Sequence, residues 1–127
     1  MDSKMIILLS SQNDRSSQLI STLKSKDLFV STVKNIDQAT SRLTSSDIFM
    51  ILIDYISIKE AERNDLKILF ANASSTKFVI YDVPDDATRR RAFYRLGTYR
   101  ILPENYNLED IVFFCSNAQK KLKQMVN

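Results

Sequence analysis

Five short apolar runs alternate along this chain with segments in which apolar residues recur every three or four positions. A short apolar run bounded by polar residues predicts a buried strand, and the recurrence predicts an amphipathic helix. Alternation of the two element types is typical of a parallel sheet that is covered by helices on both faces and joined by right-handed crossovers. The predicted strands are Met5–Ser10, Leu28–Val33, Ile48–Ile53, Lys77–Tyr81 and Tyr99–Leu102.

The helices between these strands are predicted from polar caps as well as from periodicity. Two of them are expected at Asp37–Thr44 and around Leu66–Ala73, and Gly97 is expected to end the fourth as a C-cap. We therefore expect an α/β fold of the flavodoxin-like (βα)5 type, a three-layer sandwich with a five-stranded parallel sheet in the order 2-1-3-4-5. The candidate N-caps of the first, fourth and last helices are Asn13 or Asp14, Asp85 or Asp86, and Asn107.

Composition limits the classes of function that this chain can have. Its 127 residues, 44% of them apolar, suit one domain spanning 1–127. The chain has no histidine and one cysteine, Cys115, which argues against histidine-based triads, transition-metal sites and internal disulfides and favours a cytoplasmic location. No apolar run approaches the roughly 18 residues of a membrane span. We expect no cofactor, no metal and no membrane association.

The net charge of +3 is unevenly distributed. Residues 1–84 carry ten basic and ten acidic side chains, whereas residues 85–127 carry eight basic and five acidic ones. This is a mild local patch, far below the charge of a typical nucleic-acid-binding domain. We therefore expect nucleic acid to be contacted only through an attached output domain.

The candidate site lies where the order of the strands reverses, at the carboxyl ends of the first and third strands. The third strand, the most apolar run of the chain, ends at Asp54, and the first ends at Ser10 and Ser11. These side chains are expected to meet at one edge of the sheet.

The order of elements, Ile-Leu-Ile-Asp54, and Gly97 followed by Tyr99-Arg100-Ile101-Leu102-Pro103 together resemble the CheY-like receiver domains of response regulators. The resemblance extends over nearly the whole chain and implies that Asp54 stands at the phosphoacceptor position. Receivers hold Mg²⁺ with two acidic residues at the end of strand 1, because charge builds up on the transferred phosphoryl group. The matching residues here are Ser10 and Ser11, and hydroxyls are poor ligands for Mg²⁺.

Two further receiver features are replaced. The Ser or Thr at the end of strand 4 matches Asp82, or Val83 or Pro84 after a small shift. The lysine before the proline of strand 5 matches Leu102, while the switch aromatic is retained as Tyr99. The resemblance therefore implies a degenerate receiver, a pseudo-receiver, of the kind found at the N-terminus of LuxR-type or NtrC-like transcription regulators. Asp54 and Asp82 would form an unneutralised pair, which tends to raise the pKa of one carboxyl. The first interpretation of Asp54 is a strand-end residue that caps or solvates a loop, and the alternatives are a phosphoacceptor and another ligand contact.

A basic and aromatic surface is expected on the fourth helix, the fifth strand and the last helix, a face that receivers commonly use to dimerise. Acidic residues at the start of the last helix could pair with arginines of a second copy. The alternatives are a solvated charged face and a cyclic-dinucleotide site, since arginine binds both bases and phosphates. The candidate interface residues are Arg89, Arg90, Arg91, Tyr94, Arg95, Arg100, Glu109, Asp110, Phe113 and Phe114.

The sequence thus predicts a non-enzymatic, phosphorylation-independent receiver domain. It would serve as a regulatory, dimerisation and protein-interaction module of a bacterial transcription or signalling regulator, as the N-terminal part of a longer protein. One alternative is a working receiver that is phosphorylated at Asp54, and another is a cyclic-dinucleotide sensor.

Overall fold

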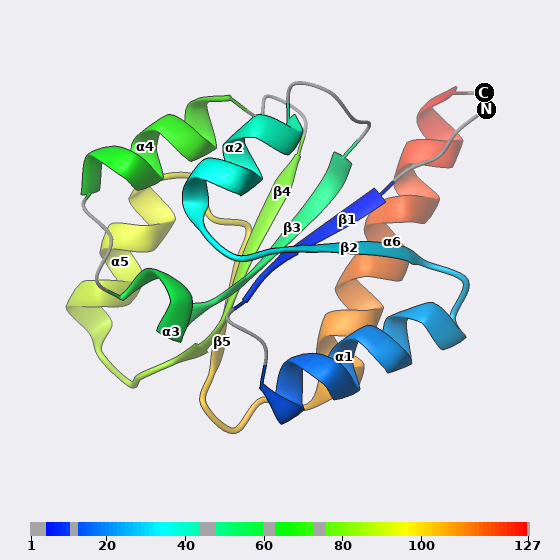
Figure 1. The fold of residues 1–127 in the computed structure, drawn as a ribbon, viewed down its shortest axis with the longest axis horizontal. Coiled ribbons are helices and arrows are strands. Elements are labelled where there is room, and N and C mark those ends of the chain that lie inside the picture. The colour runs from blue at the N-terminus through cyan, green and yellow to red at the C-terminus, as the bar shows by residue number, and fades with distance from the viewer. Residues whose placement is uncertain (1–4, 11–12, 44–47, 60–62, 73–75, 127) are drawn as a thin grey trace.

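A computed structural model describes residues 5–10, 13–43, 48–59, 63–72 and 76–126 of the chain. Five parallel strands form one sheet in the order β2-β1-β3-β4-β5, as predicted (Figure 1). The strands are β1 Met5–Leu9, β2 Phe29–Val33, β3 Ile48–Asp54, β4 Lys77–Val83 and β5 Arg100–Pro103. The helices are α1 Asp14–Ser25, α2 Ile36–Leu43, α3 Tyr55–Ile58, α4 Arg63–Ala71, α5 Ala87–Arg95 and α6 Leu108–Val126. Within these residues, no helix is long and apolar enough to cross a membrane.

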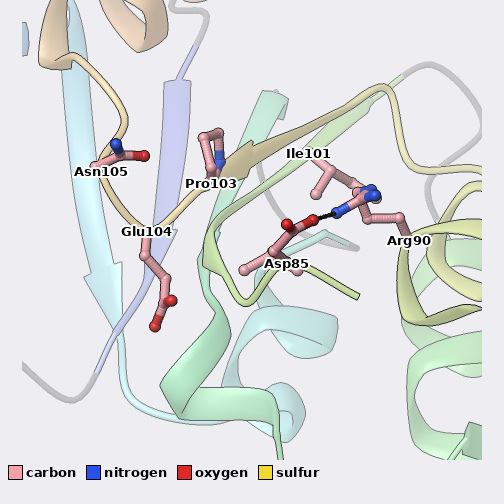
Figure 2. Close-up of a pocket in the computed structure, with 7 residues that line it drawn as sticks. Asp85, Arg90, Ile101, Pro103, Glu104 and Asn105 are labelled. Atoms are coloured by element: carbon pink, nitrogen blue, oxygen red, sulfur yellow. Dashed lines mark hydrogen bonds and ion pairs between the residues drawn. The ribbon is translucent and has the colours of Figure 1, made fainter. Parts of the chain in front are cut away.

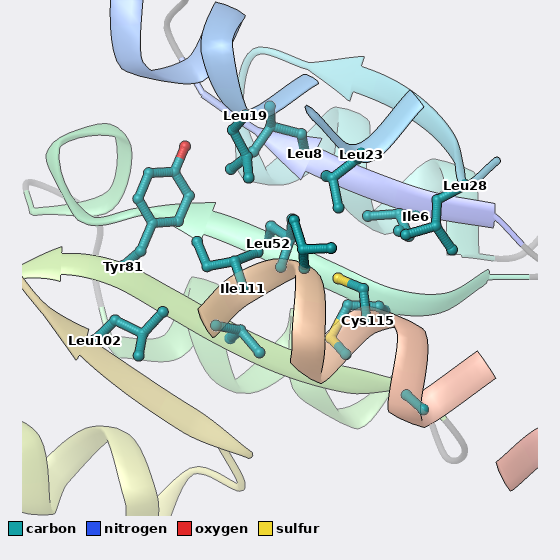
Figure 3. Close-up of a cluster of buried hydrophobic side chains, with 14 of the residues drawn as sticks. Ile6, Leu8, Leu19, Leu23, Leu28, Leu52, Tyr81, Leu102, Ile111 and Cys115 are labelled. Atoms are coloured by element: carbon teal, nitrogen blue, oxygen red, sulfur yellow. The ribbon is translucent and has the colours of Figure 1, made fainter. Parts of the chain in front are cut away.

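Helices cover both faces of the sheet, which confirms the three-layer sandwich. On one face α1 and α6 pack through residues such as Leu19 and Ile111 against Leu52 of the central strand (Figure 3). On the other face α2, α3, α4 and α5 pack on Ile51 and Ile53. Neighbouring residues of β3 point to opposite faces, and all seven are buried. The uninterrupted apolar run of β3 is therefore what a strand between two helical layers requires.

The predicted capping residues lie at the helix ends and form hydrogen bonds with backbone groups there. Asn13 caps α1, Asp86 caps α5, and the Asn107 side chain accepts the Glu109 N–H at the start of α6, 3.0 Å away. Gly97 ends α5 with φ of +108°, a conformation that favours glycine. Its N–H and that of the next residue return to carbonyls of α5 in a Schellman motif.

Several element ends lie one or two residues from their predicted positions, and three differences concern β3, β4 and β5. The short helix α3 follows β3 directly, where no helix was expected, because the Asp54 side chain caps its first turn. β4 continues past Tyr81 to Val83, and Asp82 has a left-handed φ of +61° at this extension. β5 begins at Arg100, one residue later than predicted. The first two changes reshape the carboxyl edge of the sheet.

Replacing Leu52 by Ala tests the packing of the central strand. Leu52 is fully buried, so the variant should lose about 2–5 kcal/mol of unfolding free energy through lost burial and a residual cavity. Urea denaturation followed by circular dichroism measures the loss. Ile68→Ala is the control, because its side chain is 54% exposed, and it should change stability much less. Equal losses in the two variants would contradict the assigned layers.

Candidate functional site

Asp54 is completely buried at the end of β3. One carboxylate oxygen, Oδ1, accepts the backbone N–H of Ile56 at 3.3 Å and so caps α3. The sequence left several interpretations of Asp54 open, and the structure shows the one in which its side chain caps the following segment.

The second oxygen of Asp54 accepts hydrogen bonds from two side chains of the β1–α1 segment. Ser10 Oγ lies 3.3 Å and Asn13 Nδ2 3.1 Å from Oδ2. The Asn13 Oδ1 atom also accepts the Ser16 N–H at 2.9 Å, so one side chain caps α1 and holds Asp54. Sequence reasoning identified Asn13 only as a cap. Its position just after the first strand, opposite the end of the third, was the signal that could have placed it in the site.

A chain of hydroxyl groups continues from Asp54 into the core. Ser10 Oγ lies 2.6 Å from Ser16 Oγ, which lies 3.2 Å from the Tyr81 hydroxyl. Tyr81 is fully buried, and burial raises its pKa well above the ordinary tyrosine range, partly offset by its hydrogen bond to Ser16. Tyr81 therefore remains a neutral phenol that can act as a hydrogen-bond donor. Ser11, predicted beside Ser10, lies outside the described residues.

Asp82 lies at the same edge and has a counter-ion that the sequence did not predict. The Arg15 Nη1 atom of α1 is 3.1 Å from Asp82 Oδ1. Burial raises the pKa of Asp82; Arg15 opposes this, and the charges of Asp54 and Glu104 add to it. The expected rise in one carboxyl pKa is thus present, with burial as its main cause. The expected absence of neutralisation is wrong, because Arg15 pairs with this carboxylate.

Arg15 also reaches the segment between β5 and α6. Its Nη1 atom donates to the Glu104 carbonyl oxygen at 2.7 Å, and its guanidinium carbon lies 4.3 Å from the centre of the Tyr106 ring. Burial raises the pKa of Tyr106, and Arg15 partly opposes the rise. No local pattern pointed to Arg15, because its three contacts join residues that are distant along the chain.

The residues matched to the receiver's strand-5 features lie apart from Asp54. Leu102 is buried in the apolar cluster under α1 and α6, so an aliphatic side chain stands where receivers have a lysine (Figure 3). The Tyr99 N–H donates to the Phe78 carbonyl near the start of β4, whereas Asp54 pairs with Tyr81 further along. The Tyr99 ring contacts the cations of Lys77 and Arg100, at 4.5 and 4.4 Å. Tyr99 is therefore not part of the Asp54 cluster.

The predicted interface arginines of α5 fall into two groups. Arg89 donates to the Tyr55 hydroxyl, and Arg90 pairs with Asp85 at 2.8 Å beside a hollow of about 640 Å³ (Figure 2). Arg91 and Arg95 are exposed, and so is 47% of Tyr94.

The α6 side of this face is acidic and aromatic. Glu109 and Asp110 are exposed, Phe113 is 63% exposed, and Phe114 packs edge-on against Tyr99. The exposed Arg100 guanidinium lies 4.4 Å from the centre of the Tyr99 ring and 5.6 Å from that of Phe114. Within the described residues, Glu109 and Asp110 form no ion pair with the arginines of α5, so their charges are available to a partner.

The Mg²⁺ that receivers use does not fit the donors present at this edge. Ser10 and Asn13 offer a hydroxyl and an amide, both already bonded to Asp54, and the Asp82 carboxylate faces Arg15. Among the residues that the structure describes, no group of three or more Asp, Glu, His or Cys side chains could hold a metal ion. A hard divalent cation needs several free oxygen ligands, which these residues do not supply.

The pH dependence of stability tests the environment of Asp82. Burial raises its pKa above the ordinary value of 3.8, so the folded protein binds this proton more tightly than the unfolded chain does. Its stabilising contribution is complete below the unfolded pKa and is lost as the pH rises through the higher folded pKa. The unfolding free energy of Asp82→Asn minus that of the wild type should therefore increase from about pH 4 upward and then level off. A difference that is constant with pH would contradict the burial of this carboxylate.

Comparison with known proteins shows which solved structures share this architecture. No protein-family model and no curated protein matches the sequence. Solved structures do match: the signal receiver domain of a putative LuxO repressor protein from Vibrio parahaemolyticus superposes with a TM-score of 0.81 at 14% identity, over 100% of this chain and 98% of that one. A response regulator from Thermotoga maritima gives a TM-score of 0.74 at 14% identity, over 92% and 98% of the two chains.

A third structure is described as one of a family of redox sensors in the streptococci that evolved from two-component response regulators. It superposes with a TM-score of 0.77 at 17% identity, over 96% of this chain and 53% of that one. At these identities the likeness concerns architecture. The chain has the fold of the CheY-like receiver domains of response regulators.

Proposed function

We propose that this chain is a phosphorylation-independent receiver domain that regulates through protein contacts. The observation that carries the proposal is the state of the Asp54 carboxylate, which is fully buried and accepts hydrogen bonds from Ser10, Asn13 and the Ile56 N–H. An in-line phosphoryl transfer needs an accessible carboxylate oxygen and a cation to offset the developing charge. Here both oxygens are engaged with protein donors.

The surroundings of Asp54 support the same proposal. A phosphoryl group on Asp54 would replace one negative charge by about two near Asp82, a carboxylate whose counter-ion is already provided by Arg15. The aliphatic Leu102 cannot supply the charge that a lysine would. The runner-up is a working phosphoacceptor, favoured by the position of Asp54 at the exit of β3 in a receiver fold.

The regulatory contact is proposed to be a homodimer through α5, β5 and α6. This face carries a largely exposed phenylalanine, Phe113, with basic side chains on α5 and acidic ones at the start of α6. A two-fold axis would bring α5 of each copy opposite α6 of the other, which pairs opposite charges around aromatic anchors. The module would be part of a bacterial transcription or signalling regulator and would have no enzymatic activity.

Redox sensing by the single cysteine is a weaker candidate, despite the similarity to the streptococcal redox sensor. Cys115 belongs to α6 and is fully buried in the core, and burial raises the pKa of its thiol to about 12. Thiolates rather than thiols react with oxidants and disulfides, so this side chain suits the core.

Phosphorylation is tested with acetyl phosphate and Mg²⁺, followed by intact mass spectrometry at neutral pH. We expect no mass increase corresponding to a phosphoryl group, because the Asp54 oxygens are engaged and the described residues of this edge do not form a cation site. A receiver with an intact acidic pair serves as the positive control. A phosphoryl adduct that disappears in Asp54→Asn would overturn the proposal in favour of the runner-up.

The dimer is tested with Phe113→Asp, measured by light scattering coupled to size-exclusion chromatography. Placing a charge at the centre of the interface should shift the protein to monomer, raising the dimer dissociation constant by about tenfold or more. Phe29→Asp is the matched control, since Phe29 is 65% exposed on the edge strand β2, outside the proposed face. If Phe29→Asp dissociates the dimer and Phe113→Asp does not, the interface lies elsewhere.

A further inference from the structure

Arg15 connects three separate parts of the carboxyl edge of the sheet. It projects from the first turn of α1 to Asp82 near the end of β4, to the Glu104 carbonyl, and to the Tyr106 ring. The partners lie 67, 89 and 91 positions further along the chain. Each contact taken alone contributes little to stability, but one guanidinium makes all three. Its planar, rigid geometry suits a group that bridges several partners.

The β4 partner of Arg15 is held in an uncommon conformation. Asp82 has φ of +61°, and the pairing of β4 with β5 shifts register between Ile80 and Val83, on either side of it. Left-handed backbone at a residue other than glycine costs free energy and persists where surrounding contacts hold it. Its carboxylate is also mostly removed from water, with a side chain only 12% exposed. The Arg15 guanidinium offsets the negative charge of this carboxylate.

We propose that Arg15 is an internal latch that holds the segment between β5 and α6 against α1 and β4. It provides at this edge a fixed positive charge that belongs to the chain itself. The inference goes beyond the proposed function, since it identifies what fixes the conformation of the edge when no phosphoryl group does. The role of the latch in signalling rests on the proposed function, whereas the contacts of Arg15 do not depend on that function.

The latched segment leads directly into the proposed interaction face. Glu104 and Tyr106 precede α6 by a few residues, and the first two turns of α6 carry Glu109, Asp110 and Phe113. Freeing the segment would loosen the start of α6 and the aromatic anchor on it. The latch thus adds a polar connection from α1 to the segment that leads into this surface, beside the direct packing of α1 on α6.

An arginine outside the proposed interaction face provides a matched control. The Arg42 Nη1 atom of α2 donates to Ser31 Oγ of β2 at 2.8 Å. β2 is the edge strand opposite β5 in the sheet order. Removing the Arg42 guanidinium should therefore leave the segment between β5 and α6 unchanged.

Amide hydrogen exchange at neutral pH, resolved by NMR, tests the latch in Arg15→Ala and Arg42→Ala. In Arg15→Ala the protected amides of residues 104–108, such as the Tyr106 N–H that donates to the Pro103 carbonyl, should exchange about tenfold faster, as expected for losing a charged hydrogen bond, while β3 amides keep their protection. In Arg42→Ala the same amides should be unaffected. Unchanged exchange at 104–108 in a folded Arg15→Ala would overturn the latch.

Asp82→Asn tests the same inference if Arg15→Ala does not fold. An asparagine tolerates the left-handed φ and removes only the charge opposite Arg15. Exchange at 104–108 should accelerate although the protein loses no global stability at neutral pH, because a buried charge has been removed. Unchanged exchange in this variant would also overturn the latch. Failure of the proposed function would instead appear as a phosphoryl adduct on Asp54, an outcome independent of these exchange rates.

Discussion

A carboxylate that has been withdrawn from water must be matched by hydrogen-bond donors, and the structure at the edge of the sheet depends on meeting this requirement at Asp54. An ionised group without partners would carry a penalty of several kcal/mol. Three donors meet it, and each has a structural consequence. Ser10 orients the end of β1, Asn13 fixes the start of α1, and the Ile56 N–H begins α3. The side chain that marks the phosphoacceptor position therefore organises three chain segments around itself, and it does so by using the oxygen atoms that a phosphoryl transfer would need.

The charge on the neighbouring strand is balanced in a similar way. Asp82 adds a second carboxylate close enough to Asp54 for the Asp54 charge to raise the pKa of Asp82, and burial makes the ionised form of Asp82 costly. In a receiver, a metal ion and a lysine balance the negative charge of this region, both available for chemistry. Here the compensating charge belongs to Arg15, which is also bonded to a backbone carbonyl and stacked on an aromatic ring. A cation engaged in three contacts is a structural element, and its charge is already used by the protein.

The sequence predicted what depends on periodicity and on local capping. The five strands, their order, the caps at Asn13, Asp86 and Asn107, and the role of Gly97 all follow from residues within a few positions of one another. Asn13 as a partner of Asp54, and Arg15 as the partner of Asp82, could not be predicted, because these contacts join residues 41 and 67 positions apart. The helix α3 was missed for a different reason: four residues are too few to display helical periodicity. Tyr99 matched a family position in sequence, yet the strand register places it well away from Asp54.

A regulatory domain changes the behaviour of its partner only if it has two states that the signal distinguishes energetically. Phosphorylation distinguishes them in a receiver by adding charge at one aspartate. In this chain Asp54 already accepts hydrogen bonds from three protein donors. Under the proposed function, the difference between states therefore comes from another contact. The face formed by α5, β5 and α6 can supply it, because it contains exposed aromatic and charged groups that gain from a partner. It is also connected through the segment after β5 to Arg15 and Asp82, where strained backbone and a buried charge make the arrangement less stable than the apolar core around it. Binding energy applied at α6 would therefore act on the part of the molecule that is least costly to rearrange.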